Sequence, residues 1–105
     1  MSTFIVLGKF SGQGAKGLMT SDADRSAIVD KAASAAGAKM ISYHITRGIY
    51  DFTMQTEAES FDQIAAMNLK AKAAGTVGKL DVLESLDIDE VRKIAKNVNF
   101  QPPSA

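Results

Sequence analysis

Two strand-like segments, residues 39–46 and 49–56, are separated in the sequence by Arg47 and Gly48 alone. Both segments alternate apolar and polar residues, a spacing typical of β-strands whose two faces differ. A connection of two residues that includes glycine is typical of a tight β-hairpin. The two strands are therefore predicted to be antiparallel neighbours, which excludes an all-parallel sheet.

The segments on either side of this hairpin continue an alternation of strands and helices. Strands are predicted at residues 3–10 and 77–86, and helices from Ser21 to Gly37, from the Ser60-x-x-Gln63 capping box to Gly75, and from Asp87 onward. This order predicts an α+β fold, a ferredoxin-like βαββαβ unit plus a C-terminal helix, with a four-stranded antiparallel sheet. One face of that sheet is left without helices.

The alternation also predicts which residues share a sheet face. A two-residue turn pairs residues whose numbers sum to an odd value, so the apolar sets of both strands point to the core. On the core side, the predicted pairs are Tyr43 with Phe52 and Ile45 with Tyr50; on the other side, they are His44 with Asp51, Ser42 with Thr53, and Met40 with Gln55. In the first helix, Ile28, Ala32 and Ala35 are predicted to share one face.

His44 and Asp51 are the candidate catalytic residues. Directly opposed on neighbouring strands, their side chains would be in contact, and a carboxylate can orient an imidazole for proton transfer. The alternative is a cross-strand charge pair worth at most about 1 kcal/mol, with no catalytic role. Ser42, Arg47, Thr53, Gln55 and Arg25 are the candidate ligand-binding residues, the two arginines because a guanidinium can hold a carboxylate or phosphate.

The segment Gly12-Gln13-Gly14-Ala15-Lys16-Gly17 has the spacing G-x-G-x-x-G of a dinucleotide-binding loop. Its surroundings do not fit that function, because no acidic residue ends the next strand and antiparallel hairpins provide no switch point for a dinucleotide. The segment is therefore predicted to be a flexible loop, and no cofactor is expected.

Composition narrows the class of protein. The chain has 105 residues, 12 basic and 12 acidic residues, one histidine and no cysteine. A zero net charge argues against nucleic acid as the main partner, and the histidine and cysteine counts argue against a metal site. Without cysteines, a signal segment or a membrane-length apolar run, the expected protein is cytoplasmic, with one domain at residues 1–98 and a tail at 99–105.

The segments TFIVLGKFSGQG and SYHITRGIYDFTM resemble those of the GYD domain family, whose Gly-x-Tyr-Asp signature is here Gly48-Ile49-Tyr50-Asp51. The similarity extends over residues 3–95. It implies the dimeric α/β-barrel type of ferredoxin-like fold, in which two bare sheet faces enclose a central cavity, but no established reaction. Relatives often have Asn-Val-Arg-Thr-Glu where this chain has Thr76-Val77-Gly78-Lys79-Leu80, so the charged groups of that segment are missing here.

Three classes of function fit these expectations. The first is a homodimer or higher oligomer that binds a small molecule between facing sheets. The second is an assembly or accessory subunit whose bare sheet face and last helix bind another chain. The third is a cofactor-independent isomerase or monooxygenase, with His44 as base, Asp51 orienting it and Arg47 holding an anionic group.

Overall fold

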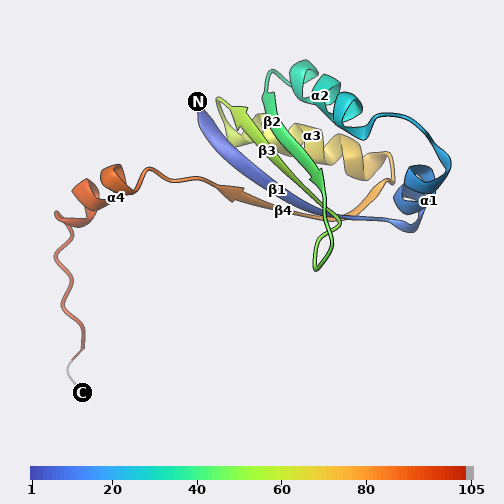
Figure 1. Cartoon of the computed structure of the whole chain (residues 1–105). Coiled ribbons are helices and arrows are strands. Elements are labelled where there is room, and N and C mark those ends of the chain that lie inside the picture. The colour runs from blue at the N-terminus through green and yellow to red at the C-terminus, as the bar shows by residue number, and fades with distance from the viewer. Residues whose placement is uncertain (104–105) are drawn as a thin grey trace.

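A computed structural model describes residues 1–103 of the chain (Figure 1). The elements are β1 (Ser2–Phe10), α1 (Gly12–Thr20), α2 (Arg25–Ala35), β2 (Lys39–Ile45), β3 (Phe52–Ala58), α3 (Phe61–Ala73), β4 (Val77–Glu84) and α4 (Ile88–Ala95). The strands form one sheet in the order β2-β3-β1-β4, and every neighbouring pair is antiparallel. This is the predicted α+β, ferredoxin-like arrangement.

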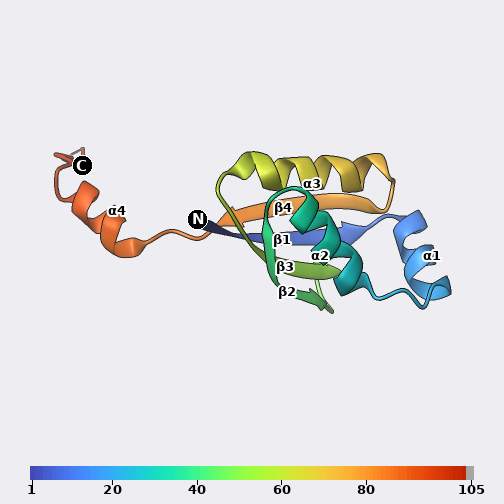
Figure 2. The same cartoon turned by 90° about the horizontal axis from the view of Figure 1, so that it is seen from above.

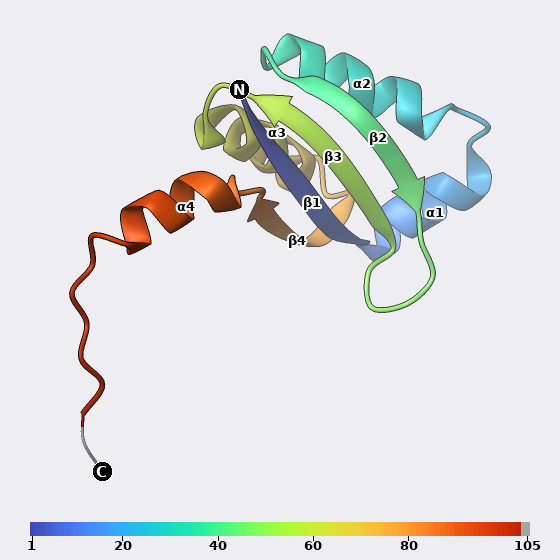
Figure 3. The same ribbon diagram turned by 60° about the vertical axis from the view of Figure 1, so that its left-hand side comes forward.

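Helices α2 and α3 lie on the same face of the sheet, as the view from above shows (Figure 2). Alternate residues of the central strands are buried beneath them, including Phe4, Val6 and Met54. Ala33 of α2 and Ile64 of α3 complete this core and are fully buried. The core is therefore confined to one side of the sheet, and the opposite side has no helix in front of it (Figure 3).

The glycine-rich segment is helix α1, so the prediction of a flexible loop was wrong. Ser11 begins this helix: its Oγ accepts from Gly14 N at 3.0 Å, and its own N–H donates to the Thr76 carbonyl at 3.1 Å. Gly14 packs against the Thr76 backbone, where a Cβ would come within 1.9 Å of the carbonyl oxygen. The glycine thus permits close contact between α1 and the start of β4, which local propensity does not reveal.

The second helix starts later than predicted. Asp24, not Ser21, is its N-terminal cap, with Asp24 Oδ1 accepting from Ala27 N at 3.3 Å. The face that carries Ile28, Ala32 and Ala35 is not the most buried one, because Ala33 is buried whereas Ile28 is 54% exposed. The predicted end holds: the chain leaves the helix at Gly37, whose φ of 81° favours glycine.

The helices in the second half of the chain begin and end close to the predicted residues. Gln63 Oε1 accepts from Ser60 N at the start of α3, and Gly75, with φ of 77°, follows its last turn. Asp87 caps α4 by accepting from Asp89 N at 3.0 Å.

No helix within residues 1–103 has the combined length and apolar character needed to cross a membrane.

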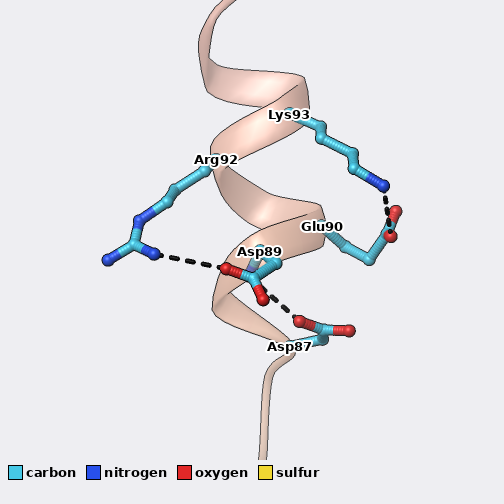
Figure 4. Close-up of polar contacts among 5 residues, drawn as sticks. All are labelled: Asp87, Asp89, Glu90, Arg92 and Lys93. Atoms are coloured by element: carbon cyan, nitrogen blue, oxygen red, sulfur yellow. Dashed lines mark hydrogen bonds and ion pairs between the residues drawn. The ribbon is translucent and has the colours of Figure 1, made fainter.

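Helix α4 stands apart from the sheet and from the other helices (Figures 1 and 3). The molecule is elongated as a result, with extents of 59 × 34 × 22 Å. Two ion pairs span the polar half of α4: Asp89 to Arg92 at 3.2 Å, at the left of Figure 4, and Glu90 to Lys93 at 3.1 Å, at its right. On the other side, Ile88, Val91 and Ile94 are exposed. The helix is amphipathic, and its apolar side has no covering within residues 1–103.

Candidate functional site

The bare face of the sheet has an apolar centre. Because Phe4 and Val6 point to the core, Ile5 and Leu7 of β1 point to the opposite face. Leu83 of β4 lies beside Ile5 in the register and is 52% exposed. We call Ile5, Leu7 and Leu83 the apolar strip. It runs along the central strand β1 onto β4, on the side that no helix covers.

A set of polar residues lies beside this strip on the same face. Ser42 pairs with Gln55 and His44 pairs with Thr53 across strands β2 and β3. We call these four residues the polar patch. The sequence correctly predicted that they share a face, because the apolar residues that alternate with them, Phe52 and Met54, are buried on the other side.

The predicted pairing of His44 with Asp51 was wrong, because the register differs by two residues. Strand β2 ends at Ile45 and β3 begins at Phe52, which leaves a six-residue connection, 46–51, in place of the two-residue turn. This connection is closed by a hydrogen bond from Thr46 N to the Asp51 carbonyl at 2.8 Å. His44 therefore faces Thr53, Tyr43 faces Met54 and Ile45 faces Phe52.

Asp51 instead ties the connection to the end of β1. Its carboxylate accepts from Phe10 N at 2.9 Å, and its own N–H donates to the Gly8 carbonyl at 2.8 Å. Both contacts lie beside the irregularity between Lys9 and Phe10, where the register of β1 with β4 shifts. The carboxylate thus stabilises backbone that has left regular pairing.

The two tyrosines lie on opposite sides of the sheet, although both were predicted in the core. Tyr43 packs against the core as expected, and burial raises the pKa of its phenol. The hydroxyl of Tyr50 donates to Asp81 Oδ2 at 2.7 Å. Asp81 pairs with Leu7 on β1, so this contact belongs to the bare face. The hydrogen bond lowers the pKa of Asp81 and raises that of Tyr50.

The two candidate arginines are far apart in the fold. Arg47 is exposed near the tip of the connection 46–51. Arg25 begins α2, on the helix-covered side of the sheet, where its Nη2 donates to the Gly14 carbonyl at 3.1 Å. Its guanidinium also lies 5.1 Å from the centre of the Phe10 ring. Arg25 therefore cannot share a site with the polar patch within one chain.

Sequence reasoning missed an open groove between α2 and α3. It encloses about 670 Å3, and Arg25 lines it together with the ring of Phe10 and the side chain of Met67. The available signal was the alanine content of both helices, since small side chains leave space between neighbouring helices. The alanines that line the groove are Ala32, Ala35, Ala36, Ala66, Ala71 and Ala74.

Comparison with known proteins identifies the domain and its fold. The family model of the GYD domain matches residues 4–95. No curated protein matches the sequence. Among solved structures, the chain is similar to FFRP-DM1, with a TM-score of 0.56 and 10% identity over 82% of this chain and 100% of that one.

Two further solved structures are similar to the chain. TTHA0845 from Thermus thermophilus has a TM-score of 0.54 and 14% identity, over 83% of this chain and 95% of that one. The hypothetical protein PHS023 from Pyrococcus horikoshii has a TM-score of 0.52 and 12% identity, over 82% and 90%. At these identities the likeness establishes the fold alone.

Proposed function

The chain belongs to the GYD domain family, and on this basis we propose that it works as a homodimer or higher homo-oligomer that binds a small molecule between facing sheets. The observation that carries the proposal is the apolar strip of Ile5, Leu7 and Leu83 on a sheet face that no helix covers. Apolar groups in contact with water favour association, and such patches often mark interaction sites.

A second copy is the partner that this face fits best. In a twofold symmetric pair, each strip meets the same strip of the other copy, and two sheets pack at a distance of about 10 Å. The chain has no net charge, so no overall repulsion opposes this pairing. The polar patch lies beside the strip and becomes enclosed along with it.

The polar patch supplies the chemistry for binding. Ser42, Thr53 and Gln55 offer hydroxyl and amide groups that both donate and accept hydrogen bonds, and His44 adds an imidazole. Such groups recognise a small polar molecule once water is excluded. The isomerase or monooxygenase alternative has lost its support, since the carboxylate of Asp51 accepts from Phe10 N instead of facing His44.

The mass of the protein in solution tests the pairing. Sedimentation velocity should give at least twice the 11.1 kDa of one chain. Leu7→Glu should give single chains, because it places charges on both contacting strips. Leu69→Glu makes the same change at an exposed position on α3 and should leave the mass unchanged. A wild-type protein with the mass of a single chain would contradict the proposal. So would a Leu7→Glu variant whose mass in solution equals that of Leu69→Glu.

Native mass spectrometry tests the binding separately. We expect a small molecule to accompany the purified oligomer, and Ser42→Ala/Gln55→Ala to lose it while remaining associated. Loss of the oligomer without loss of binding would place the ligand elsewhere. An oligomer that carries no small molecule contradicts the binding proposal but not the pairing.

Helix α4 favours a second candidate function, that of an assembly subunit. Its exposed apolar residues Ile88, Val91 and Ile94 are spaced so that they share one side of the helix. Isolated helices of this length are marginal in water, so a covering partner would stabilise α4. If α4 binds another chain, Val91→Glu should release that partner or lower the mass of the oligomer. Lys93→Glu, on the ion-paired side, should do neither.

A further inference from the structure

The groove between α2 and α3 is separate from the bare face, because the sheet lies between them (Figure 2). Its volume of about 670 Å3 falls within the range of about 300 to 1,000 Å3 typical of small-molecule sites. Residues of the sheet line it, including Val6, Phe52 and Met54, and so do residues of both helices. The sheet therefore provides an apolar floor for the groove, and the two helices provide its walls.

The walls do not close over this floor. Ile28 of α2 lines the groove and is 54% exposed, although a residue of this kind is ordinarily buried. Ala32 of α2 and Ala71 of α3 also line it, and their side chains are too short to bridge the two helices. Apolar surface thus stays in contact with water, and an apolar ligand that displaced this water would gain free energy.

The charges that line the groove have one sign. Arg25 and Lys70 are the charged lining residues, and no aspartate or glutamate is among the lining residues. Arg25 belongs to none of the ion pairs formed within residues 1–103, and one of its five N–H groups donates to the Gly14 carbonyl. It therefore retains a positive charge and free donors for an anionic group.

The position of Arg25 indicates how such a ligand would lie. Its guanidinium is stacked near the Phe10 ring, and this contact holds the side chain at the end of the groove nearest α1. Phe10 is also stacked on Phe52, with 5.1 Å between ring centres, and Phe52 on Tyr43, with 5.7 Å. A row of three aromatic rings thus leads from the cation along the groove floor.

We propose that the groove between α2 and α3 binds a small carboxylate with an apolar body, whose head group pairs with Arg25 and whose body covers the aromatic row. A guanidinium can form two parallel hydrogen bonds with a carboxylate, and the apolar floor excludes water from the rest of the ligand. This site is independent of the pairing of the bare faces, so either proposal can fail without the other.

The test is a titration of the isotope-labelled, full-length protein, followed by amide chemical shifts, with two ligands that share one tail. Decanoate carries the proposed head group, and decylammonium carries the opposite charge. We expect decanoate to cause saturable shifts at residues of α2, α3 and the end of β1. Decylammonium should bind at least tenfold more weakly.

Two pairs of variants assign the contacts. Arg25→Met should weaken decanoate binding at least tenfold, whereas Arg47→Met removes a guanidinium outside the groove and should not. Ala32→Leu adds volume at an exposed position that lines the groove, and it should also weaken binding. Ser34→Leu makes a comparable addition on α2 outside the groove and should leave binding unchanged.

Three results would overturn the proposal. They are equal binding of decanoate and decylammonium, wild-type affinity in both Arg25→Met and Ala32→Leu, and shifts confined to the bare face. Circular dichroism of each variant separates a lost contact from a lost fold. If Arg25→Met unfolds, the Ala32→Leu and Ser34→Leu pair still decides the question.

Discussion

Thr56 is fully buried on the core side of β3, and its hydroxyl has no hydrogen-bond partner among residues 1–103. A buried polar group without a partner destabilises a protein by about 1 to 3 kcal/mol. Thr56→Val keeps nearly the same shape and removes this penalty. We therefore expect the variant to raise the free energy of unfolding by about 1 kcal/mol, as measured by urea denaturation.

Thr3→Val is the matched control for this change. Thr3 lies on the neighbouring strand β1, opposite Glu57, and is only half-buried. Its replacement should change the stability by less than about 0.5 kcal/mol. A destabilised Thr56→Val variant would contradict the account, because it would mean that the Thr56 hydroxyl is satisfied by a buried water.

The hydrogen bond from Tyr50 to Asp81 predicts a pH dependence of stability. The pKa of Asp81 is lowered below 3.8 by this bond, so its contribution is present above pH 3.8 and is lost as the pH falls through the folded-state value. The pKa of Tyr50 is raised above 10.0, so its contribution is present below pH 10.0 and is lost as the pH rises through the folded-state value.

Tyr50→Phe removes the bond. It should abolish the alkaline dependence and weaken the acid one, which Lys79 and Lys9 also support by lowering the pKa of Asp81. Thermal unfolding should show wild type melting above Tyr50→Phe at neutral pH, with the gap narrowing in strong acid and in strong alkali. The measurement is the difference in melting temperature at a series of pH values. A gap that stays constant from acid to alkali would contradict this assignment of the Asp81 contact.

At the scale of elements, two glycines of α1 should respond in opposite ways to the same substitution. A Cβ on Gly14 would lie 1.9 Å from the Thr76 carbonyl oxygen, so Gly14→Ala should cost about 2 kcal/mol or more. A Cβ on Gly17 would lie 3.7 Å from Arg25 Nη2, an ordinary contact, so Gly17→Ala should stabilise the helix by up to about 1 kcal/mol.

Urea denaturation of both variants checks this prediction. Stabilisation by both alanines would mean that α1 does not pack closely on the Thr76 backbone. Destabilisation by both would mean that the segment needs glycine for flexibility, as the sequence prediction of a loop assumed. Opposite changes in stability for the two alanine variants are expected only if α1 packs against the Thr76 backbone.

The sequence predicted the elements whose signals are local. Helix α3 begins after Ser60, whose N–H donates to Gln63, and it ends before Gly75. Both ends are set by contacts within a few residues, and the sequence predicted both correctly. Helix α1 was missed because its stabilising contacts, from Ser11 and Gly14 to Thr76, join residues far apart in the sequence. Periodicity could not reveal them.

For the pairing of the strands, too, the sequence predicted one feature and missed another. Alternation of side chains correctly placed Ser42, His44, Thr53 and Gln55 on one face. The same alternation is unchanged when one strand slides by two residues, so it could not separate the observed register from the predicted one. The partner of His44 therefore depended on the connection 46–51, whose length is fixed by contacts of Asp51 with β1.

At the scale of the whole molecule, the sheet separates two surfaces, and no other part of residues 1–103 covers either of them. On one side lie the apolar strip and the polar patch, and on the other lies the groove between α2 and α3. Helix α4 extends beyond both. The groove was not predicted, although both helices are rich in alanine, because it depends on the distance between two helices that β2 and β3 separate in the sequence.

The central claim is that the bare sheet faces of two copies pack on each other. It is tested most directly by isotope-filtered nuclear Overhauser spectra of a mixture of methyl-labelled and unlabelled protein, which detect contacts between chains alone. The account predicts contacts between chains among the methyl groups of Ile5, Leu7 and Leu83. An oligomer in which these methyl groups contact no other chain, or a protein that shows no contacts between chains, would contradict it.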